Sequence, residues 1–433
     1  MTTRRDFLRS LTAAATAVGV AGAPKFAFGQ SIHGKTFIKI FLPGGADGLH
    51  LFPKVGDPAY YQYRPDLGIE PPNQQDANAS ISLGPDLPRT MNPNLALLRE
   101  IWEEGNMMIA PSTSFDGANG SHFDCQRWIG TGANNNFIDG YMNRYLQEAS
   151  DSEHPIRGAA LGERGLPTSL RGDITIPVIP SANSYELQRP EFCRGTDCEE
   201  NRLTEMMREV ASHDVDQAAV ENQIRDTQLV MLDTIADVRR ADREYAPSAG
   251  GMEYSTSGLG RGLKLCAQIL KAGIPLEVGT LKWSIGWDTH AGQISGGADR
   301  FANQGFRYHS EMVKGAQDML TFYRDMGPAM KDIVVLVGSE FGRTKKQNGS
   351  RGTDHGRGGA WWAFGGDIRR GMADDVATID DSNFRQNYVP MMTSYRDIVA
   401  EIMVRHLGMD ERLVSTVFPD HRFNDLRLIG GTA

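Results

Sequence analysis

Residues 333–344 have the sequence IVVLVGSEFGRT, in which an apolar, mostly β-branched run ends in a short polar segment. Ile333–Val337 is typical of a strand that is buried on both faces, as the strands of parallel sheets are. In open α/β sheets, functional sites form beyond the carboxyl ends of the strands. Glu340 and Arg343, which follow this strand directly, are therefore candidates for a functional site.

Strand patterns alternate with helix patterns through the rest of the chain. We expect further strands at 35–42, 107–110, 275–281 and 361–364, and helices at 94–104, 122–129, 259–272, 300–325 and 395–406. Strands that alternate with helices predict a mostly parallel sheet with both faces covered. The sequence therefore predicts an α/β fold, a three-layer α/β/α sandwich.

One block does not follow this alternation. Residues 150–198 are rich in Pro, Gly and Arg and show little periodicity, whereas 199–245 form a long, charged stretch with helical spacing. We interpret 150–250 as a helical insertion or cap beside the core, and a solvated helical hairpin is the alternative. The chain length fits either one large domain with an insertion or two domains.

The first 29 residues have the three parts of a removable signal peptide. Arg4-Arg5 precedes an apolar run over 11–23, and small residues at Ala27 and Gly29 suit a cleavage site. The paired arginines indicate the twin-arginine route, which exports folded proteins. An uncleaved anchor is disfavoured because the apolar run is short for a membrane span. We therefore expect a mature chain of 30–433, located in the periplasm or secreted, with the twin-arginine export machinery as a partner.

The charge of the chain excludes one broad class of partner. The net charge is −9, and removal of the leader with its +3 leaves −12. Nucleic-acid binding needs a basic surface, so this acidic chain is not expected to bind nucleic acid. No apolar run after the leader is long enough for a membrane span.

The four cysteines contain no Cys-x-x-Cys pair, which disfavours a thiolate zinc site or a thioredoxin-like motif. Cys193 and Cys198 occupy a polar loop of an exported protein, so they form either a local disulfide or two free thiols. Cys266 lies on the apolar face of an expected helix, and we place it in the core.

Polar residues gather in five segments that lie just past the expected strands. These segments are Gly44–Gly48, Gly120–Asp124, Trp287–His290, Ser339–Thr344 and Gly352–Gly356. Each alone is compatible with an ordinary surface loop, but five of them at strand ends of one α/β chain predict a shared site. Their carboxylates and imidazoles suit Zn, Mn or Fe better than Ca.

Two residues in these segments are candidates for catalysis. Ser121 opens a helix, where the positive end of the helix dipole suits a nucleophilic hydroxyl or an oxyanion, and an ordinary helix cap is the alternative. Arg343 has the fork geometry that grips an anion with two parallel hydrogen bonds. We expect His122 either to be structural or to support a neighbouring site residue, and Asp354 to orient His355.

These motifs carry a resemblance. The twin-arginine leader, Pro-Gly-Gly-x-Asp-Gly at 43–48, Ser-His-Phe at 121–123, Trp-Asp-x-His at 287–290, Glu-Phe-Gly-Arg-Thr at 340–344 and Gly-Thr-Asp-His-Gly at 352–356 all occur. Together they resemble the exported bacterial family "domain of unknown function 1501". That family is grouped by similarity with the alkaline phosphatase and sulfatase superfamily.

The resemblance implies an alkaline phosphatase-like fold with one or two divalent metals at the strand ends. By position, the implied metal ligands are Asp47, Asp288, His290, Glu340 and His355. Ser121 resembles the nucleophile of the superfamily. The chain departs from the pattern at Glu340-Phe341, where the superfamily usually has Asp-His, so one imidazole ligand is missing.

Two function classes follow from these observations. The first is a metal-dependent hydrolase of phosphate or related esters, which would use Zn, Mn or a similar divalent metal on a small anionic ester. The second is a non-catalytic exported binding or assembly protein on a degenerate hydrolase fold, with a protein partner.

Overall fold

The computed structural model describes residues 34–73, 75–133, 137–150, 152–186, 204–209, 219–248, 252–366, 368–380 and 387–430. The expected leader at 1–29 and the pair Cys193 and Cys198 lie outside the described residues, so those expectations stay predictions.

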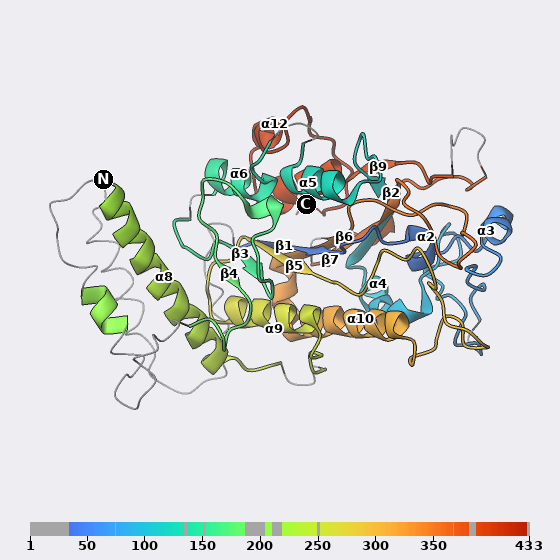
Figure 1. Cartoon of the computed structure of the whole chain (residues 1–433), viewed down its shortest axis with the longest axis horizontal. Helices are drawn as coiled ribbons and strands as arrows, with labels where there is room; N and C mark the ends of the chain where they lie inside the picture. The colour runs from blue at the N-terminus through green and yellow to red at the C-terminus, as the bar shows by residue number, and fades with distance from the viewer. Residues whose placement is uncertain are drawn as a thin grey trace.

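A mixed, mostly parallel sheet runs through the middle of the molecule (Figure 1). Its strands in the described part of the chain are β1 (Thr36–Phe41), β2 (Met107–Ser114), β3 (Gly158–Leu161), β4 (Val178–Ile179), β5 (Val278–Lys282), β6 (Ile333–Gly338), β7 (Gly359–Gly365), β8 (Gly371–Met372) and β9 (Thr393–Ser394). They are ordered β4-β3-β5-β1-β6-β7-β2-β8, and β9 pairs with β2. The pairs from β4 to β6 are all parallel, whereas β7 runs antiparallel to both β6 and β2.

Helices cover both faces of this sheet. They are α2 (Gly48–Leu51), α3 (Pro58–Tyr63), α4 (Arg99–Glu103), α5 (His122–Thr131), α6 (Tyr141–Glu148), α8 (Ala219–Glu244), α9 (Gly258–Lys271), α10 (Arg307–Met326), α11 (Tyr395–Glu401) and α12 (Val414–Val417). Figure 1 shows α9 and α10 on one side of the sheet and α5, α6 and α12 on the other. The predicted α/β class and its three layers are confirmed.

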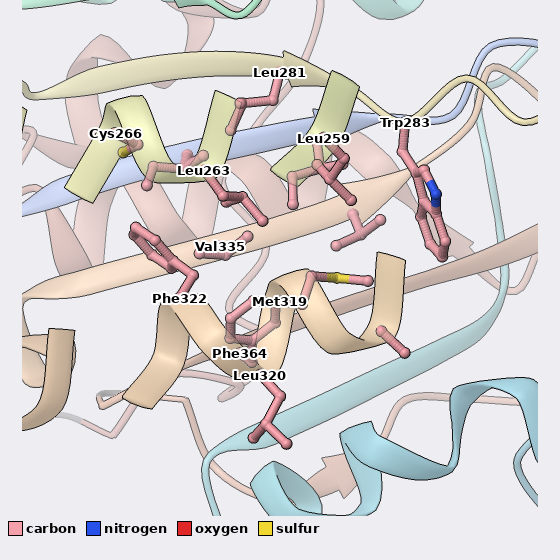
Figure 2. Close-up of a cluster of buried hydrophobic side chains, with 14 of the residues drawn as sticks. Leu259, Leu263, Cys266, Leu281, Trp283, Met319, Leu320, Phe322, Val335 and Phe364 are labelled. Atoms are coloured by element: carbon pink, nitrogen blue, oxygen red, sulfur yellow. The ribbon is translucent and has the colours of Figure 1, made fainter. Parts of the chain in front are cut away.

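The apolar character of β6 follows from its place between two cores. Val335 and Val337 belong to the cluster shared with α9 and α10, whereas Val334 and Leu336 belong to the cluster on the opposite face. Burial of each such side chain contributes about 1.5–3 kcal/mol. Figure 2 shows the first cluster, in which Cys266 of α9 is buried as expected.

The block 150–250 is only partly an insertion. β3 and β4 lie inside it and extend the central sheet beside β5, which corrects the expectation for this part. Residues 158–161 are Gly-Ala-Ala-Leu, a short segment without β-branched or aromatic side chains, so it lacks a strand signal. The later part does project: α8 leaves the body of the molecule in Figure 1, and its carboxyl-terminal end joins α9 through Gln268 Nε2 and Asp242 Oδ1 at 2.7 Å.

A helix that spans a membrane must be both long and apolar. Among the described residues, no helix combines the length and the apolar character needed to cross a bilayer. α8 and α10 are the long helices of this set, and both carry many charged side chains.

The topology brings distant segments to one edge of the sheet. β1, β5 and β6 are parallel, so the loops that follow them meet at their shared carboxyl edge. Because β7 is antiparallel to β6, its amino-terminal end lies at the same edge. Residues 352–358, which precede β7, therefore join the loops after β1, β5 and β6.

Candidate metal centre

Three side chains at this edge form a group that could hold a metal ion: His122, Asp288 and His355. His122 is the first residue of α5, Asp288 lies in the loop after β5, and His355 lies in the segment before β7. Their ligand atoms all lie within 4.8 Å of one another. His355 Nε2 is 3.1 Å from Asp288 Oδ1, and His122 Nε2 is 3.5 Å from Asp288 Oδ2.

His290 extends this group on the solvent side. Its Nε2 lies 3.2 Å from Asp288 Oδ1 and 3.0 Å from His355 Nε2. The structure thus brings together Asp288, His290 and His355 of the predicted set. We refer to His122, Asp288, His290 and His355 as the histidine–aspartate cluster.

The three imidazoles share one arrangement. The Nδ1 atom of His122 is 2.7 Å from Glu340 Oε1, that of His355 is 2.7 Å from the Gly120 carbonyl, and that of His290 is 3.1 Å from Asp354 Oδ1. Carboxylate and carbonyl oxygens accept hydrogen bonds, so each Nδ1 is the protonated, donating nitrogen. When such a ring carries its proton on Nδ1 alone, its Nε2 offers a lone pair, and the three Nε2 atoms lie near Asp288.

A cation held between these acceptor atoms would be stabilised by all of them. The Nε2 atoms of His290 and His355 face each other and the same Asp288 carboxylate, an arrangement that positive charge between them would stabilise. Imidazoles held by carboxylates or carbonyls at their other nitrogen are a recurrent feature of metal sites. The donor set of three nitrogens and one carboxylate fits Zn, Mn or Fe.

The cluster is open to solvent on one side. The Asp288 side chain is 44% exposed, and those of His122 and His355 are 28% and 27% exposed. A closed structural metal site would be buried all round, whereas catalytic sites leave a coordination position free. The exposed side therefore leaves room for water or a substrate.

Arg343 stabilises the site rather than facing solvent. Its buried guanidinium donates to the carbonyls of Gly44, Gly45 and Thr353 at 2.7, 2.7 and 3.0 Å, and also to Asp288. Burial raises the pKa of Asp288, but the hydrogen bond and charge of Arg343 outweigh it and hold that pKa below its ordinary value. Since its donors are already engaged, Arg343 does not fit the predicted role of gripping a substrate anion.

Asp47 is not part of the cluster. Its buried carboxylate binds Arg64 through both oxygens at 2.7 and 2.9 Å and accepts from Gln293 Nε2 at 2.7 Å. It also caps α2 through the backbone N–H of Leu49 at 3.1 Å. Burial raises its pKa, but the charge of Arg64 outweighs burial and lowers it. The predicted metal ligand is thus placed in a buried ion pair.

Glu340 lies behind His122 instead of facing Asp288. It is fully buried and accepts from the Gly44 N–H and from Gln126 Nε2, both at 2.9 Å, as well as contacting His122 Nδ1. These contacts orient the imidazole. His122, which the sequence led us to treat as structural or supporting, places an imidazole beside Asp288, whereas the Glu-Phe pair contains none. The signal in the sequence that could have placed His122 in the site was its position directly after Ser121, at the start of an expected helix.

Ser121 is the amino-terminal cap of α5, as predicted. Its Oγ accepts from the Asp124 N–H at 3.4 Å, a long hydrogen bond. Its chain neighbours both belong to the site, because the Gly120 carbonyl binds His355 and the next residue is His122. Ser121 therefore lies at the rim of the cluster, beside the positive end of the α5 dipole.

Gly44 lets the loops after β1 and β5 approach each other. It has φ +124°, and a Cβ atom there would lie 2.7 Å from the backbone nitrogen of Asp288. A side chain at this position would therefore push the Asp288 loop away from the β1 loop. The Gly-Gly turn seen in the sequence is required by this contact.

Comparisons with known proteins give two findings. A model of the family described as "Protein of unknown function (DUF1501)" matches residues 205–424, which include Asp288, His290 and His355. Among solved structures, a protein in the alkaline phosphatase superfamily from Vibrio parahaemolyticus is similar, with 11% sequence identity and a TM-score of 0.29. That similarity covers 87% of this chain and 72% of the other. No curated protein matches the chain.

Proposed function

This chain belongs to the DUF1501 family of proteins of unknown function, and we propose that it is a metal-dependent hydrolase of phosphate or related esters. The observation that carries the proposal is the common arrangement of His122, His290 and His355. Each has its Nδ1 fixed by an oxygen and its Nε2 near Asp288 or another Nε2. The proposed ligand set takes in His122 and leaves out Asp47 and Glu340.

The residues of the chain have separate tasks in this proposal. The cluster holds the cation, and Glu340, Asp354 and the Gly120 carbonyl keep the imidazoles in the donating tautomer. A divalent cation held there would supply Lewis acidity and a lowered pKa for a bound water or hydroxyl. The amino end of α5 adds partial positive charge for an anionic substrate group.

Ser121 is the proposed nucleophile. Its hydroxyl stands at the start of α5, immediately before His122, and its hydrogen bond to the Asp124 N–H is long enough to be exchanged for a substrate contact. An attack by Ser121 Oγ would break the bond between the phosphoryl or related group and the ester oxygen, release the alcohol with the serine proton, and form a covalent ester that water then hydrolyses to free Ser121 and the acid. Direct attack by water is the alternative within the same reaction class.

The test combines metal analysis with activity. The mature chain is stripped of metal, reloaded with Zn or Mn, and assayed on an aryl phosphate, an aryl phosphodiester and an aryl sulfate. We expect the wild type to bind metal and turn over at least one ester. His355→Ala should lose metal affinity and activity, whereas His154→Ala, a histidine beside Asp237 outside the cluster, should keep both.

The outcomes separate the two function classes. Absence of turnover on all three esters with either metal rejects the hydrolase. A chain that also purifies folded without metal and binds neither metal supports the non-catalytic binding or assembly protein. If Ser121→Ala leaves the rate unchanged while His355→Ala abolishes it, the nucleophile is water rather than Ser121.

A further inference from the structure

A polar cavity lies on the α5 side of the sheet, and one of its lining residues, Gln126, contacts Glu340 behind the histidine–aspartate cluster. It has a volume of about 230 Å³ and lies over the ends of β1 and β5. Its polar lining includes Lys39, Gln126, Glu163, Arg171, Thr280 and Lys282. Nothing in the proposed hydrolase mechanism uses this cavity.

Lys39 is the unusual residue of this cavity. It lies on β1, is 4% exposed, and holds its ammonium group near the rings of Tyr141, Phe41 and Trp361 at 5.3, 5.7 and 5.8 Å. Burial lowers its pKa to about 7, and the charges of Glu163 and Glu340 partly offset that effect. Within the described part of the chain, no hydrogen bond or ion pair engages its Nζ. An ammonium group with so little exposure is poorly hydrated, so an acceptor bound in the cavity would stabilise its charged form.

The other charged groups of the cavity already have partners. Lys282 Nζ lies 2.8 Å from Glu163 Oε2, so these two charges compensate each other. Arg171 donates its Nε to the Leu166 carbonyl at 3.3 Å. The lining thus contains three cationic side chains and one carboxylate, and Lys39 is the buried cation that lacks a direct counter-ion among the described residues.

We propose that this cavity binds a small organic anion whose carboxylate or phosphate group pairs with the ammonium of Lys39. The oxyanion would replace the hydrogen bonds that burial removes from the amine. The aromatic rings around Lys39 accommodate its positive charge. The apolar side chains of Phe41 and Leu281, which also line the cavity, would contact the carbon skeleton of the ligand.

One helix connects this cavity with the metal centre. Gln126 lines the cavity and donates its Nε2 to Glu340 Oε1 at 2.9 Å, the same oxygen that lies 2.7 Å from His122 Nδ1. Gln126 and His122 are one turn apart on α5. A ligand that competes for the Gln126 amide would therefore act on the orientation of His122.

The binding test uses the purified mature chain with inorganic phosphate, succinate and the neutral analogue succinamide, measured by isothermal titration calorimetry. We expect saturable binding of phosphate or succinate and none of succinamide, and the bound anion shows which oxyanion the cavity takes. Lys39→Met should weaken binding at least about tenfold, the range of one charge-assisted hydrogen bond. Lys314→Met, at an exposed lysine paired with Glu311, should bind like the wild type.

Three results would overturn the proposal. They are no saturable binding of either anion, equal binding by Lys39→Met, or loss of binding in His355→Ala, which would locate the anion at the metal centre. A second measurement covers the case in which Lys39→Met does not fold. A saturating anion should slow acetylation of Lys39 in the wild type, read by peptide mass with Lys314 as the reference, and an unchanged rate contradicts the site. Neither measurement depends on hydrolase activity.

Discussion

At the residue scale, the histidines of the cluster differ from two buried histidines elsewhere in what surrounds their ring nitrogens. His50 and His309 are fully buried, and neither nitrogen of either ring has a hydrogen-bond partner among the described residues. In the cluster each Nδ1 has an oxygen partner, and each Nε2 faces the Asp288 carboxylate or another Nε2. Partnered rings at an open edge are suited to binding, whereas buried unpartnered rings stay neutral.

Glu340→Gln tests the orienting role of the carboxylate. The amide keeps an oxygen near His122 Nδ1 but removes the negative charge that increases the basicity of the imidazole. We expect metal affinity to fall by about 10–100-fold with little change in folding, measured by competition with a chromophoric chelator. Glu311→Gln, at a carboxylate of an exposed pair on α10, is the control. Unchanged affinity in Glu340→Gln contradicts this role.

Asp47→Asn separates a structural role from metal binding. The side chains of Arg64 and Asp47 are 0% and 1% exposed. Loss of the carboxylate therefore leaves the Arg64 guanidinium buried without its counter-ion. We expect the free energy of unfolding to fall by about 3–5 kcal/mol in urea titrations. Metal affinity of the folded variant should be unchanged. The control is Asp410→Asn, in an exposed ion pair with Arg412, which should leave stability unaltered. A selective loss of metal binding by Asp47→Asn would show that Asp47 is a metal ligand.

At the scale of elements, the site depends on the close approach of the loops after β1 and β5. The strands β1 and β5 are paired neighbours in the sheet. Arg343, which follows β6, joins the two loops by donating hydrogen bonds to the carbonyls of Gly44 and Trp287. The loops after three parallel strands thus meet at the guanidinium group of Arg343. The short Gly-Gly turn is what allows the backbones to meet.

Gly44→Ala tests whether the site needs this close contact between the loops after β1 and β5. The added Cβ would meet the Asp288 backbone nitrogen at 2.7 Å, and a φ of +124° is unfavourable for alanine. We expect destabilisation of more than about 1 kcal/mol in urea and weaker metal binding, because the Asp288 loop must move. Gly56→Ala is the matched control, since a Cβ there has nothing within 4 Å. Equal stability of the two variants would show that the loops have room to separate.

At the scale of the whole molecule, buried histidines make stability depend on pH. Burial lowers the pKa of His50 to about 3 and that of His309 to about 4, from an ordinary value of 6.5. Below pH 6.5 the unfolded chain takes up protons at these residues while the folded chain does not. The free energy of unfolding therefore falls as the pH drops from about 6.5 toward 4.

The size of this effect can be measured. Each such histidine contributes up to about 1.4 kcal/mol per pH unit inside the window. We expect urea unfolding at pH 4.5 to 7 to show a smaller slope of stability against pH for His50→Asn than for the wild type. His154→Asn, at a partly exposed histidine, serves as the control. A slope that is the same for wild type and His50→Asn contradicts a neutral buried His50.

Export of the folded chain is a further proposal for the molecule as a whole. The leader at 1–29 supports it, together with a site assembled from residues more than 200 positions apart, which exists only after folding. We expect Arg4→Lys combined with Arg5→Lys to retain the chain in the cytoplasm, measured by cell fractionation. Arg9→Lys should not affect export, and amino-terminal sequencing should find cleavage after Gly29. Export of the double variant would argue against the twin-arginine route.

The sequence by itself determined the α/β class and most of the sheet. Ile333–Val337 and 35–42 carry strand signals that are local, because burial on both faces demands apolar residues at every position. The residue types of Asp288, His290 and His355 at strand ends likewise indicated the site. β3 and β4 were not predictable, because β4 has only two residues and β3 is rich in Gly and Ala, so the pairing of β3 with β5 and of β4 with β3 specifies them rather than their own side chains.

Only the tertiary structure decided which polar residues meet. Arg64 and Gln293 engage Asp47 across 17 and 246 positions, and Glu340 turns His122 toward Asp288 across 218. No local pattern encodes such partners, because a carboxylate is a metal ligand or half of an ion pair according to what the fold places beside it. The sequence therefore indicated the kind of site, and the long-range packing of three loops and α5 selected its members.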